Sequence, residues 1–302
     1  MNPWTPLAGA TLGWAAGSVL TRAVLVRGVS TWTMIPLRMG FALMTLVVVM
    51  AVTKRFWTTD ATAWRRGVLL GSVAMAIPMV LMTLAFEDLP VSLGGLLIAL
   101  VPLATIGAAH FLVAGERFQI RALPGLLVAL GGSALLVGLG GGSVQGVGDL
   151  RRGVLLMFGG VIAAGVGGAL SRRFALEIPS NDLVLPQFVV NTVLVTLILP
   201  FLLDFEIAAV DGVSWWLIAG VGVLGTTLAF GSFLAAAGLN PASRLALVGY
   251  AIPVLSVALA VLFLNETLTR EIIGGAVLIT GGVVLAERAT THVPEPGVAT
   301  AG

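Results

Sequence analysis

The chain has 302 residues, of which 58% are hydrophobic and 10% are charged, and its formal net charge is +2. Soluble domains carry about 25% charged residues, so a chain with a mean hydropathy of +1.07 could not cover a water-facing surface. The composition therefore predicts an integral membrane protein. The sequence contains no cysteine, which excludes a disulfide framework and a thiolate metal site.

Ten apolar runs have the length of membrane-spanning helices, which need roughly 20 residues to cross a hydrocarbon core of about 30 Å. In chain order they are residues 4–26, 31–52, 67–85, 91–114, 122–139, 153–170, 183–203, 213–237, 245–264 and 272–286. The runs are continuously apolar, whereas the strands of a membrane barrel alternate, so the predicted fold class is all-α. The first run follows a terminus without a basic region, and we expect it to remain as a span.

The second half of the chain repeats the first. Gly9, Gly13, Gly17 and Thr21 recur as Gly159, Ala163, Gly167 and Ser171, and the run GERFQIRALPGLLVALGG recurs as NETLTREIIGGAVLITGG. The predicted domains are a first five-helix repeat at 1–140, a linker at 141–152, a second repeat at 153–287 and a disordered cytoplasmic tail at 288–302. An odd number of helices turns the second repeat upside down, and inverted repeats are typical of secondary transporters.

The distribution of basic residues predicts the orientation, because cytoplasmic loops are enriched in Lys and Arg. With the N-terminus inside, the inner loops and tail would hold twice as many Lys and Arg residues as the outer loops. We therefore expect a multi-pass protein of the plasma membrane with both termini in the cytoplasm.

The end of each repeat shares one pattern, in which a mid-span proline is followed by a Glu at the helix end and then by a glycine-rich helix. The pattern consists of Pro102, Glu116, Gly125 and Gly131-Gly132 in one repeat, and Pro253, Glu266, Gly275 and Gly281-Gly282 in the other. In these residues, and in Arg38 of the second span, the chain resembles the drug/metabolite transporter superfamily, in particular its EamA-type transporters. The resemblance covers residues 5–287. It implies ten helices, an inverted repeat and a central cavity that opens alternately to either side, with the fifth and tenth helices peripheral to it.

Seven residues are candidates for the substrate pathway: Trp14, Arg38, Met79, Met82, Gln187, Asn191 and Tyr250. A charge deep in a span costs about 2.5–3.5 kcal/mol, so Arg38 either contacts a substrate carboxylate or phosphate or anchors helix-end carbonyls. Gln187 and Asn191 share a helix face and could bind a ligand or join two helices. The aromatic and Met residues could form an adaptable apolar wall, or belong to the core or the lipid-facing surface.

Prolines and small residues are candidates for movement and packing. Pro102 and Pro253 are hinge candidates, with fixed kinks as the alternative. Six small residues at a spacing of four allow close helix packing or a smooth surface for rocking: Gly9, Gly13, Gly17, Gly159, Ala163 and Gly167. Glu116 and Glu266 are expected to cap helices, and with no Asp or Glu deep in a span we expect no carboxylate proton relay.

The leading functional prediction is export of small organic solutes, such as amino acids or related metabolites, by alternating access and without a cofactor or metal. A carrier of nucleotide sugars, sugar phosphates or drugs is the alternative, although dianionic ligands favour clustered Lys and Arg and the chain has a single Lys. An intramembrane enzyme is disfavoured, because there is no cysteine and the two histidines, His110 and His292, lie far apart. A non-transporting scaffold stays open. The expected partners are the small-molecule substrate and the lipid bilayer, not nucleic acid, with the chain a monomer or weak homo-oligomer.

Overall fold

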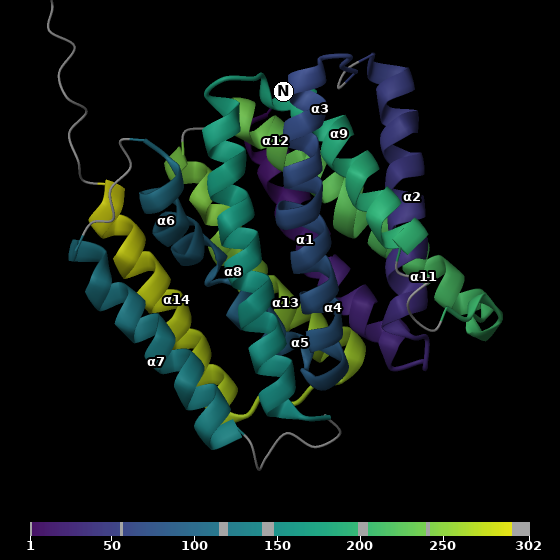
Figure 1. Cartoon of the computed structure of the whole chain (residues 1–302). Helices are drawn as coiled ribbons and strands as arrows, with labels where there is room; N and C mark the ends of the chain where they lie inside the picture. The colour runs from purple at the N-terminus through teal and green to yellow at the C-terminus, as the bar shows by residue number, and fades with distance from the viewer. Residues whose placement is uncertain are drawn as a thin grey trace, which may run out of the picture.

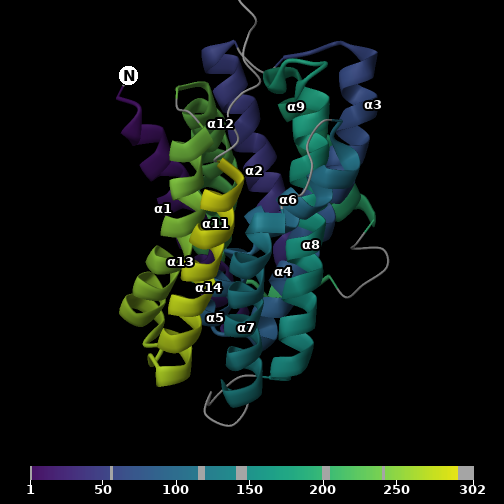
Figure 2. The ribbon, with the colours of Figure 1, turned by 90° about the vertical axis from the view of Figure 1, so that its left-hand side faces the viewer.

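The computed structural model describes residues 2–54, 57–114, 120–140, 148–198, 205–239 and 242–291, and every regular element within these ranges is helical. The α-helices are α1 (Trp4–Leu25), α2 (Thr31–Thr53), α3 (Ala61–Leu70), α4 (Ile77–Asp88), α5 (Val91–Ile98), α6 (Val101–Leu112), α7 (Leu123–Gly140), α8 (Leu150–Ala175), α9 (Ser180–Val193), α11 (Gly212–Gly222), α12 (Ala229–Leu239), α13 (Ala242–Leu264) and α14 (Arg270–Thr291). Three π-helical segments continue some of them: η1 (Gly71–Ala76), η3 (Leu194–Ile198) and η5 (Val223–Leu228). The elements stand side by side as one bundle (Figures 1 and 2).

The described helices confirm the predicted all-α membrane fold, because each expected span coincides with one helix or with consecutive helical segments. By length and composition, five stretches could cross a membrane unaided: Thr31–Thr53, Ala61–Asp88, Val91–Leu112, Leu150–Ala175 and Gly212–Phe233. Shorter apolar stretches are Ile120–Gly132, Asp182–Leu197, Ala251–Leu264 and Ile272–Ala286.

The end of α14 differs from the expectation for the tail. The helix continues to Thr291, past the predicted boundary at residue 288, because the Ala, Glu and Arg residues at this end are good helix formers. Residues 292–302 and the linker residues 141–147 lie outside the part of the chain that the structure describes.

The two halves make equivalent close contacts. Gly17 of α1 lies against η5, where a Cβ added to Gly17 would be 2.9 Å from the Cα of Gly225. Gly167 of α8 lies against η1 in the same way, and a Cβ added to it would be closer still to the Cα of Ala74. Gly17 and Gly167 are repeat-equivalent, and so are the two π-helical segments that they meet. The first helix of each repeat therefore packs against the opposite half, and the contacts of α1 with α12 and α13 and of α8 with α4 and α6 extend this exchange.

The fourth span is broken, whereas the equivalent ninth span is not. A turn at Ala99–Leu100 separates α5 from α6, and Pro102 lies in the first turn of α6. Proline has no N–H, so it cannot donate to the carbonyl of Ile98. The equivalent Pro253 lies within the continuous helix α13. The inverted repeats thus differ in backbone at the level of their matched prolines.

The last helices of the two repeats, α7 and α14, pair along one side of the bundle (Figure 2). Glycines hold them close. A Cβ at Gly132 would lie 3.0 Å from the backbone nitrogen of Ile279, and one at Gly282 would meet the backbone of Gly125 and Ala129. Neither helix contributes a described residue to the central cavity.

Candidate functional site

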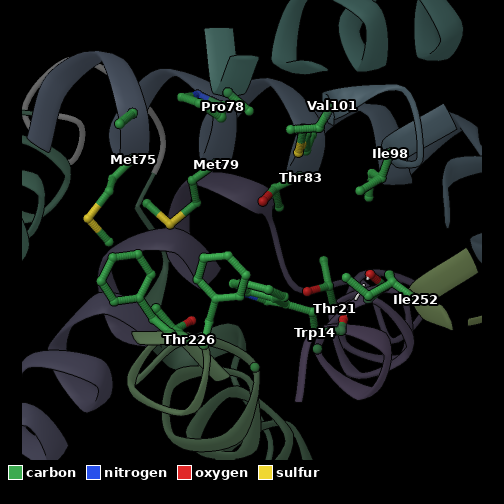
Figure 3. Close-up of a pocket in the computed structure, with 18 of the residues that line it drawn as sticks. Trp14, Thr21, Met75, Pro78, Met79, Thr83, Ile98, Val101, Thr226 and Ile252 are labelled. Carbon is green, nitrogen blue, oxygen red and sulfur yellow. Dashed lines mark hydrogen bonds between the residues drawn. The ribbon is translucent and has the colours of Figure 1, made fainter. Parts of the chain in front are cut away.

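A cavity of about 580 Å³ lies at the centre of the bundle. Its lining residues come from both repeats, on α1, α2, η1, α4, α5 and α6 of the first and on α8, α9, η5, α12 and α13 of the second. Met75, Pro78 and Met79 form one wall, and Trp14 and Thr226 lie on the wall across from it (Figure 3). The lining is mainly apolar with a few hydroxyl, amide and guanidinium groups. This is the composition of a site for a small organic molecule.

The structure places five of the seven pathway candidates on this lining: Trp14, Arg38, Met79, Met82 and Asn191. Trp14 packs against Phe233 of α12 with ring centroids 5.3 Å apart, so the indole is held by the second repeat although it belongs to the first. The cavity thus joins side chains that lie far apart in sequence, from Trp14 near the start of the chain to Ile252 near its end.

Two candidates are not placed on the lining. Gln187 is buried and is not part of the described lining; its backbone carbonyl oxygen lies where α9 meets η1, 2.7 Å from the position of a Cβ added to Gly71. The side chain of Tyr250 lies outside the described part of the chain, although Val248 and Gly249 beside it line the cavity.

Arg38 is the one charged residue among the described residues that line the cavity. Its Nε donates to the hydroxyl of Thr226 at 3.0 Å, and that hydroxyl in turn donates to the carbonyl of Val221 at 3.1 Å. The Thr226 oxygen therefore fixes one edge of the guanidinium. Among the described residues no carboxylate lies within ion-pair distance of Arg38.

Asn191 contributes a buried amide to the same lining. Its Nδ2 lies 3.4 Å from the sulfur of Met39, and its Oδ1 has no hydrogen-bond partner within the described residues. An unpaired buried acceptor is unfavourable unless a water or ligand supplies a donor. Asn191 of α9 therefore adds a polar position to the lining where α9 meets Met39 of α2.

The two hinge candidates have different positions. Pro102 lines the cavity directly after the break between α5 and α6. Pro253 is buried inside α13 and is not part of the described lining. The stripe of small residues is represented by Gly17, which lines the cavity where α1 crosses η5.

Sequence reasoning missed Thr226, Phe230 and Phe233. Thr226 lies in η5, and π-helical segments within α-helices occur frequently at functional sites. The only sequence signal was the repeat itself, which aligns η5 with the Met75 segment η1 across from it. The polar role of Thr226 depends on a contact with Arg38, which is 188 residues away, and no local pattern indicates it.

A second cavity, of about 430 Å³, lies between α1, α2, α9 and α12. Phe230 lines both cavities and so forms part of the partition between them. The ring of Phe188 packs on Phe230 edge to face, with centroids 5.5 Å apart. The second cavity lies toward the end of the bundle at which α1 begins, because its lining includes Thr5 and Pro6 at the start of α1 and Thr53 at the end of α2.

Charged side chains link three helices at the other end of the bundle. Arg152, at the start of α8, lies 2.9 Å from Asp88 and 3.5 Å from Glu87, both at the end of α4. Arg22 of α1 donates to the carbonyl oxygens of Phe86 and Glu87 at 2.5 and 2.9 Å. These bonds tie three spans together beyond the cavity.

The structure confirms the capping role that was expected of Glu266. Its carboxylate accepts hydrogen bonds from the backbone amides of Val91 at 2.6 Å and Ser92 at 3.0 Å, which are the first amides of α5. The helix dipole favours a negative charge at this end. The repeat-equivalent Glu116 lies outside the described residues. Within the described chain, no group of three His, Cys, Asp or Glu side chains is placed to hold a metal ion.

Comparison with known proteins identifies a family by its sequence model and relatives of the same fold among solved structures. The sequence model of the EamA-like transporter family matches residues 7–138 and 151–287. A solved structure titled "Crystal structure of protein" superposes with a TM-score of 0.69 at 20% identity, covering 98% of this chain and 99% of the other. This likeness concerns the fold alone. No curated protein is similar to the chain at a significant level.

Proposed function

The chain belongs to the EamA-like transporter family and is a membrane transporter, and from this premise we propose that it exports small organic solutes, amino acids or related metabolites, by alternating access. One observation carries the proposal: the central cavity of about 580 Å³ is walled by both repeats. A cavity between two inverted repeats changes its exposure when one repeat moves relative to the other. The repeats at 1–140 and 153–287 are the proposed units, joined by the linker at 141–152.

The size and lining of the cavity support a small, largely apolar solute. Ligand sites of about 300–1,000 Å³ hold molecules up to the size of a drug. Met75, Met79 and Met82 supply flexible sulfur-containing side chains, which adapt to several ligand shapes. A nucleotide sugar or sugar phosphate has less support, since Arg38 is the one basic group on the described lining and dianions favour clustered basic residues.

Two structural features on opposite sides of the central cavity support alternating access. The partition at Phe230 separates the central cavity from the second cavity, and the Arg152, Glu87 and Asp88 cluster lies at the opposite end. We place both termini in the cytoplasm of a plasma-membrane protein, on the excess of Lys and Arg in the inner loops. In this orientation the second cavity faces the cytoplasm. The transporter is proposed to act in the lipid bilayer as a monomer or weak homo-oligomer.

Counterflow in proteoliposomes tests the proposal. Vesicles are preloaded with unlabelled neutral, aromatic or polar amino acids, their related organic acids, a polyamine, a sugar phosphate or a nucleotide sugar, and uptake of the labelled partner is followed. Transient accumulation with an amino acid or a related acid is expected. Accumulation only with phosphorylated solutes would replace the proposed substrate class, and no accumulation with any solute would contradict transport of this class.

A matched pair of tryptophan variants tests the site. Trp14→Ala removes a ring from the cavity lining, whereas Trp216→Ala removes a ring that is 81% exposed on α11. We expect the first variant to raise the KM for counterflow about tenfold, from the lost apolar contact, and the second to leave it unchanged. Equal kinetics in both variants would remove Trp14 from the pathway.

A further inference from the structure

We infer that the cavity selects a monocarboxylate with an apolar body and without an ammonium group. The inference rests on the proposed function and narrows its substrate class from amino acids and related metabolites to the related acids. It comes from the charge inventory of the cavity, in which Arg38 stands without an acidic counterpart among the described lining residues.

The geometry leaves Arg38 available for a ligand. Its Nε is occupied by the Thr226 hydroxyl at 3.0 Å, and that hydroxyl is held by the carbonyl of Val221. The two terminal nitrogens have no hydrogen bond to any described residue, and the side chain is partly exposed at the cavity. A guanidinium with one edge fixed presents its remaining N–H groups in the planar fork that binds a carboxylate in two places.

Charge balance decides among the possible anions. A monocarboxylate neutralises Arg38, and the buried pair then has no net charge. A zwitterionic amino acid brings the same carboxylate but adds an ammonium group, and no described lining residue supplies an Asp or Glu to pair with it. A phosphate monoester brings a second negative charge with no second cation on the described lining. Burying an unpaired charge is costly, so both alternatives bind less well than the monocarboxylate.

The rest of the lining favours an apolar body on that carboxylate. Met75 lies on the wall across the cavity from Thr226, and Trp14, Thr21 and Ile252 lie further along the cavity from Thr226 (Figure 3). A ligand whose carboxylate meets Arg38 therefore extends its remaining atoms along methionine, tryptophan and isoleucine side chains. Branched or aromatic acids match this arrangement.

Direct binding to the purified protein in detergent micelles tests the inference with ligands that share one apolar body: isocaproate, L-leucine, isocaproamide and isopentyl phosphate. Isocaproate is expected to bind at least tenfold more tightly than each of the other three, since each of these lacks the carboxylate or carries an unpaired charge. If the unmodified protein bound L-leucine or isopentyl phosphate as tightly as isocaproate, or more tightly, the inference would be overturned.

Variants test the role of Arg38 itself. Arg38→Gln is expected to weaken isocaproate binding at least tenfold while leaving isocaproamide binding unchanged. Arg65→Gln makes the same chemical change at an exposed position on α3 and is expected to change neither. Retained isocaproate preference in Arg38→Gln would contradict the inference. The measurement needs no transport, so selective binding without counterflow would contradict the proposed function alone, and counterflow without the selectivity would contradict the inference alone.

Discussion

The contact between Gly17 and Gly225 allows a quantitative prediction about how closely the two halves pack. A Cβ on Gly17 would lie 2.9 Å from the Cα of Gly225, and a Cβ on Gly225 would lie 2.7 Å from the Cα of Gly17. Carbon atoms pack favourably at about 3.5–4.0 Å, so either alanine requires the backbones to separate by at least about 0.6 Å. Both atoms are backbone carbons that cannot rotate away. Overpacking of this kind costs about 1–3 kcal/mol.

Gly17→Ala is therefore expected to lower the free energy of unfolding by about 1–3 kcal/mol. The matched control is Gly40→Ala on α2, where no atom lies within 4 Å of the added Cβ. There alanine is expected to stabilise by about 1 kcal/mol through its higher helix propensity. Unfolding by sodium dodecyl sulfate titration, followed through tryptophan fluorescence, measures both variants. If Gly17→Ala were as stable as Gly40→Ala, the close crossing of α1 and η5 would be refuted.

The same variant separates packing from rocking at the small-residue stripe. If the stripe only packs the helices, counterflow per folded molecule should stay near that of the unmodified protein. If the stripe is the surface on which the halves move, counterflow should fall by more than the loss of folded protein explains. Gly40→Ala serves again as the control, because its added methyl group contacts nothing within 4 Å.

Three further predictions concern the ends of the bundle and the partition. Glu266→Gln should lower the free energy of unfolding by about 1 kcal/mol, because one of the two acceptors at the start of α5 becomes a donor; an unchanged unfolding curve would refute the cap. Arg27 holds the pKa of Asp211 well below its usual range, so this ion pair stabilises the folded protein at neutral pH, and the stabilisation is lost as the pH falls through the folded pKa. The thermal unfolding temperature of Asp211→Asn should therefore approach that of the unmodified protein below about pH 4, and a difference that does not change with pH would disprove this. Phe230→Ala should join the two cavities. Because the chain has no native cysteine, Thr83→Cys provides a single reporter on the central cavity, and its thiol should react faster in the Phe230→Ala background with an impermeant thiol reagent added on the side where α1 begins. An unchanged reaction rate would rule out the partition at Phe230.

Hydropathy and the internal repeat predicted most of the fold. The spans were predictable because a membrane helix must carry roughly 20 apolar residues, which leaves a signal in composition alone. The break before Pro102 was not predictable, since the matched Pro253 lies in an unbroken helix and the same residue type is compatible with both outcomes. Whether a proline breaks a span depends on the neighbouring helices, and these are not visible in local sequence.

The candidate site was predictable where a residue is unusual for its depth. Arg38 and Asn191 stand out as polar groups inside apolar spans, and both line the cavity. Gln187 has the same signal but is not part of the described lining, so a polar residue inside a span does not by itself identify a cavity position. Thr226 gives no such signal, since threonine is common in membrane helices, and its importance comes only from the hydrogen bond to Arg38.

The pairing of α7 with α14 has the symmetry of a dimer interface within a single chain. Gly132 meets Ile279, and Gly282 meets Ala129; each contact becomes the other when every residue is replaced by its repeat counterpart. Such an isologous seam needs no covalent connection between its sides, because each side carries the surface that the other requires. The two repeats could therefore be encoded by separate genes and still assemble, provided that they enter the membrane in opposite orientations. The present chain is, in these terms, a fused antiparallel dimer, and the fusion fixes a one-to-one ratio and the opposed orientation of its halves.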